Sequence, residues 1–141
     1  MSVRKYDKIP EWKWSIHLVE SVYRLSRRLP DDEKSMLSAT LRRTATSIPA
    51  RIADGYGRND PAAFPKAVCD ALGALRELQT HVIVARRLGY VSRLRTSLVD
   101  WRIRRLTRML EDLSASLGQC RVDAFEPRRG ADTKTSLRPV A

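Results

Sequence analysis

The stretch that decides the fold is 64-FPKAVCDALGALRELQTHVIVA-85. Its apolar residues recur at intervals of four and three positions, which places them along one face of a helix. Gly89 follows closely and is typical of the left-handed residue that ends a helix. The stretch therefore predicts a long helix over about residues 61–88 whose buried face consists of Phe64, Val68, Ala71, Leu75, Leu78, Val82 and Ala85.

The same periodicity on either side predicts three more helices, over about residues 11–29, 32–54 and 91–117. Pro49 lies inside the second of these and removes one backbone donor, which predicts a kink. Short connections between long helices make neighbours antiparallel. We therefore expect an all-α fold, an up-down-up-down antiparallel four-helix bundle.

The bundle is expected to form a single domain over residues 11–117. Residues 1–10 are an N-terminal lead, and residues 118–141 are expected to be a flexible, basic C-terminal tail because periodicity stops at Gly118. Gly55 and Gly57 are expected to close the second helix, and Gly57→Val is expected to destabilise the fold.

No stretch is apolar enough to span a membrane, and the N-terminus lacks the apolar core of a signal peptide. We therefore expect a cytoplasmic protein with no membrane partner. Cys69 and Cys120 are the only cysteines, and the interpretation we favour is two free thiols in a reducing compartment.

Charge is the strongest compositional signal. Lys and Arg together number 27 against 16 acidic residues, which gives a formal net charge of +11. Arg outnumbers Lys, and its planar guanidinium group binds phosphate through two parallel hydrogen bonds. The charge points first to nucleic acid and second to an acidic protein.

In an antiparallel bundle, the ends of the first and third helices meet the starts of the second and fourth at one pole. This basic pole is the nucleic-acid-binding site that we predict. A merely solubilising surface is the alternative. The residues expected there are Arg27, Arg28, Lys34, Arg86, Arg87, Arg93 and Arg95, opposed by Asp31, Asp32 and Glu33.

The fourth predicted helix has two apolar seams at helical spacing. One seam, Val99, Ile103, Leu106, Leu110, Leu113 and Leu117, is enough for a monomer's core. The second predicts a contact with another subunit, so we assign an oligomer interface or channel to Leu94, Leu98, Trp101, Arg102 and Arg105. The arginines near this seam, Arg95 included, could line a channel, pair with acids of a neighbour, or extend along a groove.

The segment 47-SIPARIADGYGR-58 resembles the signature of the bacterial four-helix-bundle family of the 23S ribosomal RNA intervening-sequence protein, which typically reads Ser-Ile-Pro-x-Asn-Ile-Ala-Glu-Gly-x-Gly-Arg. Further matches extend the resemblance over about residues 8–117. They are Trp12, Tyr23, residues 41–43, Gly73, residues 77–78 and residues 85–90.

The resemblance implies a homopentamer with a central channel and an association with nucleic acid. The same fold includes the accessory variability determinant of diversity-generating retroelements, a basic pentamer that works with a reverse transcriptase. Three positions depart from the family's pattern: Arg51 replaces Asn, Asp54 replaces Glu, and Gln79 replaces an acid. The changes at Arg51 and Gln79 make the chain more basic than the family pattern.

No enzymatic chemistry is expected. His17 and His81 are the only histidines, and neither has the spacing of a di-iron bundle site. The segment 55-GYG-57 follows a helix and not a strand, which excludes a dinucleotide-binding loop. We expect no catalytic residues, no metal and no cofactor.

The leading hypothesis is therefore a non-enzymatic, homo-oligomeric protein that binds nucleic acid, RNA more than DNA. Its sharper form is an accessory subunit of a reverse transcriptase in a diversity-generating retroelement. The alternative is a structural adaptor that binds an acidic protein partner and has no nucleic-acid role.

Overall fold

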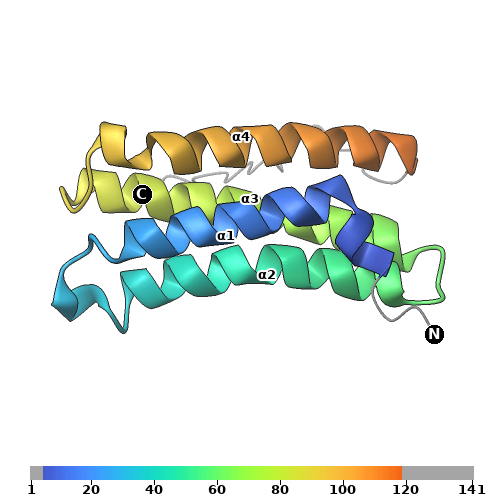
Figure 1. Ribbon diagram of the computed structural model, residues 1–141, viewed down its shortest axis with the longest axis horizontal. Coiled ribbons are helices and arrows are strands. Elements are labelled where there is room, and N and C mark those ends of the chain that lie inside the picture. The colour runs from blue at the N-terminus through green and yellow to red at the C-terminus, as the bar shows by residue number, and fades with distance from the viewer. Residues whose placement is uncertain (1–4, 119–141) are drawn as a thin grey trace, which may run out of the picture.

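The computed structural model describes residues 5–118, and within that range the chain is helical and contains no strand. A 3-10 turn, η1 (Lys5–Lys8), precedes the first helix, α1 (Pro10–Ser26), and a second turn, η2 (Asp31–Glu33), follows it. The other helices are α2 (Leu37–Gly57), α3 (Ala63–Arg87) and α4 (Arg93–Ser116). The predicted four-helix bundle is confirmed (Figure 1).

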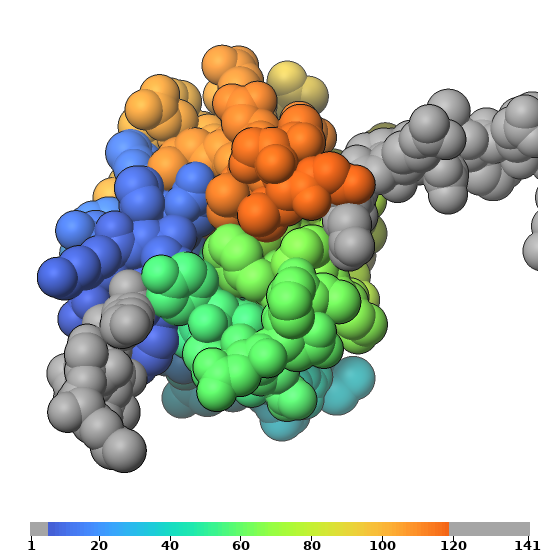
Figure 2. All heavy atoms as spheres, turned by 90° about the vertical axis from the view of Figure 1, so that its right-hand side faces the viewer, coloured from blue at the N-terminus to red at the C-terminus, as the bar shows by residue number. Residues whose placement is uncertain are grey.

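Successive helices run antiparallel, and each packs on two neighbours. The backbones of α1 and α2, α2 and α3, α3 and α4, and α4 and α1 approach closely, whereas those of the diagonal pairs do not. Viewed along the bundle, the orange end of α4 and the blue start of α1 both adjoin the green connection between α2 and α3 (Figure 2). One edge of α4 therefore lies beside α1, and the other lies beside α3.

The predicted core is confirmed. Six of the seven apolar positions predicted for α3, from Val68 to Ala85, are buried, and Phe64 is half-buried at the helix start. Four residues of the first α4 seam, from Val99 to Leu110, are buried as well. Each fully buried Leu, Ile or Val contributes about 1.5–3 kcal/mol through the hydrophobic effect, so this core holds the four helices together.

The second helix begins later than predicted. Asp31–Glu33 form the short turn η2, and α2 starts only at Leu37. The Glu33 carboxylate still caps this helix, because its Oε2 accepts a hydrogen bond from the Leu37 amide at 3.2 Å. At its other end α2 continues through the buried Pro49 to Gly57, three residues beyond the predicted end.

The remaining boundaries moved by only a few residues. The Asp60 carboxylate accepts a hydrogen bond from the Ala62 amide at 3.0 Å, and α3 starts at Ala63. Pro65 fits in its first turn because amides there need no helical partner. Gly89 adopts the left-handed conformation expected of it, with φ of 78°.

Part of the predicted N-terminal lead is ordered, since η1 covers Lys5–Lys8 and α1 begins at Pro10. The predicted tail, apart from Gly118, lies outside the described residues. The expectation of free thiols is wrong for Cys69, which is disulfide-bonded. No helix among residues 5–118 combines the length and apolarity needed to cross a bilayer.

Gly55, and not Gly57, is the glycine that the packing requires. A Cβ atom at Gly55 would overlap Cβ of Ala67 on α3 and lie 3.0 Å from the backbone oxygen of Ala63. A Cβ atom at Gly57 would have no neighbour within 4 Å. The expectation that Gly57 is critical to the fold is therefore wrong, because the close approach of α2 to α3 occurs one half-turn earlier.

We predict that Gly55→Ala lowers the stability of the bundle by about 1–3 kcal/mol, the usual cost of overpacking a filled interface. Gly57→Ala should leave stability unchanged or raise it slightly, because Ala favours helix over Gly. Urea unfolding followed by circular dichroism would measure both variants. Equal unfolding midpoints for the two would contradict this account of the α2–α3 contact.

Candidate nucleic-acid interface

The basic residues predicted to share one pole do lie at one end of the bundle. The connections α1–α2 and α3–α4 are both at this end, on the left of Figure 1. The structure nevertheless divides four of these residues between two grooves beside α4, whereas Arg27, Lys34 and Arg87 line neither groove. Arg28 and Arg95 line the groove between α1 and α4, whereas Arg86 and Arg93 line a hollow between α3 and α4.

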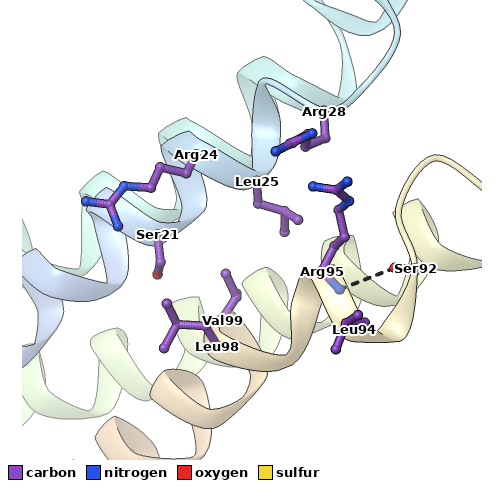
Figure 3. A pocket seen from close by; sticks show the side chains of 9 residues that line it. All are labelled: Ser21, Arg24, Leu25, Arg28, Ser92, Leu94, Arg95, Leu98 and Val99. Atoms are coloured by element: carbon purple, nitrogen blue, oxygen red, sulfur yellow. Dashed lines mark hydrogen bonds between the residues drawn. The ribbon is translucent and has the colours of Figure 1, made fainter.

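The α1–α4 groove combines an apolar floor with a basic rim (Figure 3). It has a volume of about 670 Å³. Leu25 of α1 and Val99 of α4 are buried beneath it, and Leu98 is partly exposed beside them. The basic rim comes from Arg24 on α1, from Arg28 in the turn just after α1, and from Arg95 on α4.

The guanidinium groups of this rim lack acidic partners. Arg28 and Arg95 point toward one another from opposite sides of the groove (Figure 3). Among residues 5–118, no ion pair or hydrogen bond involves the side chain of Arg24, Arg28 or Arg95. Like charges facing each other repel, so an anion entering the groove would be attracted by all three.

Arg86 differs from the exposed cation that was expected. Its Nη1 donates to Oδ2 of Asp100 at 2.7 Å and to Oγ1 of Thr96 at 3.1 Å. The side chains of Arg86 and Asp100 are only 25% and 21% exposed. Arg86 therefore joins α3 to α4, and its guanidinium group is not available to bind phosphate. Arg87, in contrast, is exposed and has no ion-pair partner within the described range.

The acidic residues of the pole are mostly engaged. Lys34 forms an exposed ion pair with Asp31 at 3.5 Å, which offsets its charge. Glu33 accepts a hydrogen bond from the Tyr90 hydroxyl at 3.0 Å and so ties the α1–α2 connection to the α3–α4 turn. This hydrogen bond is the main reason that the pKa of Tyr90 lies above its ordinary value of 10.0.

The second apolar seam of α4 is exposed, as the two-seam pattern predicted. Leu94, Leu98 and Trp101 are 83%, 44% and 46% exposed. Trp101 packs edge-on against Trp14 of α1, with ring centroids 5.6 Å apart. An apolar strip thus runs along the α1–α4 side of the monomer, and such strips mark interaction surfaces more often than chance.

Two of the arginines assigned to an interface or channel are held by α1. Nη1 of Arg102 donates to the backbone oxygen of His17 at 2.6 Å. The guanidinium carbon of Arg105 lies 5.3 Å from the centre of the Trp14 ring, within the range of a cation–π contact. Within one chain, both arginines therefore contact residues of α1.

The described residues contain no group of three His, Cys, Asp or Glu side chains that could hold a metal ion.

A family model described as 23S rRNA-intervening sequence protein matches residues 7–112. The chain belongs to this family. A search of curated proteins found no match.

The signature of the 23S rRNA-intervening sequence protein family lies at the end of the bundle opposite the predicted basic pole. It forms the last three turns of α2 and contains the buried residues Ile48, Pro49, Ile52 and Gly55, which face the core and α3. Tyr56 packs edge-on against Phe64, with ring centroids 5.3 Å apart. The segment that identifies the family is therefore a helix-packing motif.

The positions that depart from the family's pattern are all exposed. Arg51 lines a small hollow at the α2–α3 end together with Asp54 and Arg58, and the latter two form an ion pair at 3.2 Å. Gln79 lies on α3 beside α4, where the loss of an acid leaves the neighbouring arginines of α4 unopposed.

Four residues that line or support the grooves of this protein were not among the site residues predicted from the sequence. Arg24 completes the basic rim in Figure 3, and Trp14 supports both Trp101 and Arg105. Arg104 and Arg108 line the α3–α4 side. The i, i+4 spacing of Arg24 and Arg28, and of Arg104 and Arg108, was a signal in the sequence that could have found three of the four.

We predict that Arg86→Gln destabilises the bundle by about 1–3 kcal/mol, because it leaves the half-buried Asp100 carboxylate without its partner. Arg87→Gln removes the same charge from an exposed site and should change stability by less than about 0.5 kcal/mol. Thermal unfolding followed by circular dichroism compares the two. Adding Asp100→Asn to Arg86→Gln should recover part of the loss, and no recovery would show that the pair does not act as a unit.

Proposed function

We propose that this protein is a non-enzymatic, homo-oligomeric nucleic-acid-binding protein. The observation that supports it best is the concentration of unpaired arginines at one end and along both edges of α4. Membership in the 23S rRNA-intervening sequence protein family is compatible with a role near nucleic acid. RNA is the preferred ligand in this proposal, and DNA is secondary.

The physical basis is release of counterions. Arg27, Arg28, Arg87, Arg93 and Arg95 of the predicted pole have no ion-pair partner within residues 5–118. Each guanidinium that contacts a phosphate releases condensed cations, and this release supplies most of the free energy of sequence-independent binding. The pole needs no cofactor and no bond-making group to do this.

Self-association is the second part of the proposal. The exposed strip of Leu94, Leu98 and Trp101 is the surface that we assign to the contact between subunits, with Arg102 and Arg105 beside it. A homopentamer is the assembly that the family resemblance implies. Five copies of one basic pole would bind a polyanion far more tightly than one copy, because each further contact is intramolecular.

The sharper form of the proposal makes this protein the accessory subunit of a reverse transcriptase in a diversity-generating retroelement. It is supported by the family resemblance and by the basic surface.

The competing proposal, a structural adaptor for an acidic protein, is favoured by one observation, the apolar floor beneath Arg24, Arg28 and Arg95 in Figure 3. An acidic, apolar protein segment would satisfy both parts of that groove.

We predict that the full chain binds single-stranded RNA, duplex DNA and an RNA–DNA hybrid at low salt, with RNA tightest. The logarithm of affinity should fall linearly with the logarithm of salt concentration, with a slope of about −0.7 to −0.9 for each phosphate neutralised. Filter-binding titrations at several salt concentrations measure both quantities. A chain that binds none of the three at low salt would leave the adaptor as the better proposal.

We predict that Leu94→Glu dissociates the oligomer, because it places a charge in an apolar contact between subunits. Leu94 is almost fully exposed in the monomer, so helical circular dichroism should be unchanged. Sedimentation velocity at micromolar concentration compares this variant with Val84→Glu, a matched change at an exposed apolar position of α3. A wild-type chain that sediments as a monomer would remove the oligomer from the proposal.

A further inference from the structure

The edge of α4 that faces α3 contains a second groove, separate from the one in Figure 3. Two hollows of about 360 and 260 Å³ adjoin there and share Gln79 and Arg104. Arg93, Arg104 and Arg108 of α4 line these hollows with Ser97 and Thr107 between them, and the apolar Ile103 lies in the second hollow. We call this surface the α3–α4 groove.

The α3–α4 groove has an excess of positive charge. Within the described part of the chain, the side chains of Arg93, Arg104 and Arg108 take part in no ion pair or hydrogen bond. The single acid in the lining, Asp100, is already paired with Arg86 at 2.7 Å. Glu111 follows one turn after the groove and ends the basic stretch. Three arginines therefore remain without a counterion.

The spacing of these arginines suits a single strand. Fifteen residues of helix separate Arg93 from Arg108 along α4, which corresponds to about 22 Å at roughly 1.5 Å per residue. Three arginines in one row over this length provide contacts for about three phosphates of a single strand. No aromatic residue lines it, so bases would not be stacked by the protein and sequence would matter little.

The hydroxyl groups in the groove favour ribose over deoxyribose. Ser97 Oγ donates its proton to the backbone oxygen of Leu94, and Thr107 Oγ1 donates its proton to that of Ile103, both at 2.7 Å. Each oxygen is left with acceptor capacity only. An acceptor beside a phosphate-binding arginine suits a ribose 2′-hydroxyl, which can donate a hydrogen bond to it and which DNA lacks.

We propose that the α3–α4 groove binds the ribose-phosphate backbone of single-stranded RNA, with about three phosphate contacts per protomer. This inference rests on the proposed nucleic-acid function and assigns that function to a site. The site includes Arg104 and Arg108, which lie outside the predicted basic pole. Arg93, Arg104 and Arg108 bind phosphates. Ser97 and Thr107 accept hydrogen bonds from 2′-hydroxyl groups.

The test compares three double variants of the full chain, each of which removes two exposed arginines. Arg104→Gln with Arg108→Gln alters the α3–α4 groove, Arg24→Gln with Arg28→Gln alters the groove of Figure 3, and Arg43→Gln with Arg51→Gln alters α2, the helix diagonal to α4. Fluorescence anisotropy with an oligouridylate of about six nucleotides measures affinity and its salt slope. Sedimentation and thermal unfolding check that assembly and fold are unchanged.

The α3–α4 variant should lose at least about tenfold in affinity. Its salt slope should become shallower by about 1.4, because two phosphate contacts of a single strand are lost. The α2 variant should stay close to wild type. Arg104→Lys with Arg108→Lys should keep the salt slope while losing part of the affinity, since lysine retains the charge without the planar fork.

Two results would overturn the assignment while wild type still binds. A loss of affinity in the α3–α4 variant no larger than that in the α2 variant would show that only total charge matters. The largest loss of affinity in the Arg24 and Arg28 variant would move the site to the α1–α4 groove. Failure of wild type to bind any RNA would instead overturn the proposed function itself.

A second comparison tests the role of the hydroxyl groups. Ser97→Ala with Thr107→Val should reduce the preference for oligouridylate over the matching deoxyribose strand by about three- to tenfold, while leaving the salt slope as in wild type. An unchanged ratio of RNA to DNA affinity would overturn the assignment of ribose recognition to this groove.

Discussion

A helix has a limited circumference, and α4 divides its own among a core and two outer edges. Each residue turns the helix by about 100°, so the seam from Val99 to Leu110 takes the sector that faces the core. The residues left over on one edge are Leu94, Leu98 and Trp101, which lie beside α1 or face solvent. On the other edge are Arg93, Arg104 and Arg108, beside α3. All six of these side chains are exposed in the monomer, so both edges remain accessible.

The core and the course of the helices could be predicted because burial follows directly from periodicity. The seams of α3 and α4 need only the spacing of apolar residues, and both are buried except for Phe64, Leu113 and Leu117, which are half-buried. Arg86 could not be placed in the same way. Its partner Asp100 is fourteen residues away on another helix, so their contact depends on the register between α3 and α4. Register is fixed by packing and by the turn at Gly89, and neither is visible in a pattern of single residues.

Glycines and acids were misplaced for a related reason. Gly55 and Gly57 are equivalent in the sequence pattern, yet only Gly55 faces a neighbouring helix at close range. The acids after Pro30 were expected to begin α2. Glu33 instead caps that helix from outside and binds Tyr90 across the pole. Both errors come from tertiary contacts that override local preference. The prediction of a single basic pole differs most from the structure, because four of its residues line two grooves of different chemistry.

The family signature and the candidate binding surfaces lie apart in the fold. Residues 47–58 fasten α2 to α3, whereas the unpaired arginines belong mainly to α1 and α4. Members of the family can therefore share a frame and still differ in the charge that they display on α4. The exposed arginines Arg93, Arg104 and Arg108 of α4 lie outside the core, so replacing them leaves the core contacts in place.

The pair of Arg86 and Asp100 has a consequence for the entropy of association. It joins α3 to α4 at the floor of the groove between them and, with Thr96, holds the two helices at a set separation. A strand that enters the groove meets walls that are already in place, so no helix has to move and no backbone has to become ordered. The conformational cost is confined to the arginine side chains, each with about 2 kcal/mol of rotamer freedom to lose. Exposed, unpaired arginines on helices joined in this way could follow the irregular path of a flexible polyanion without a change in the fold.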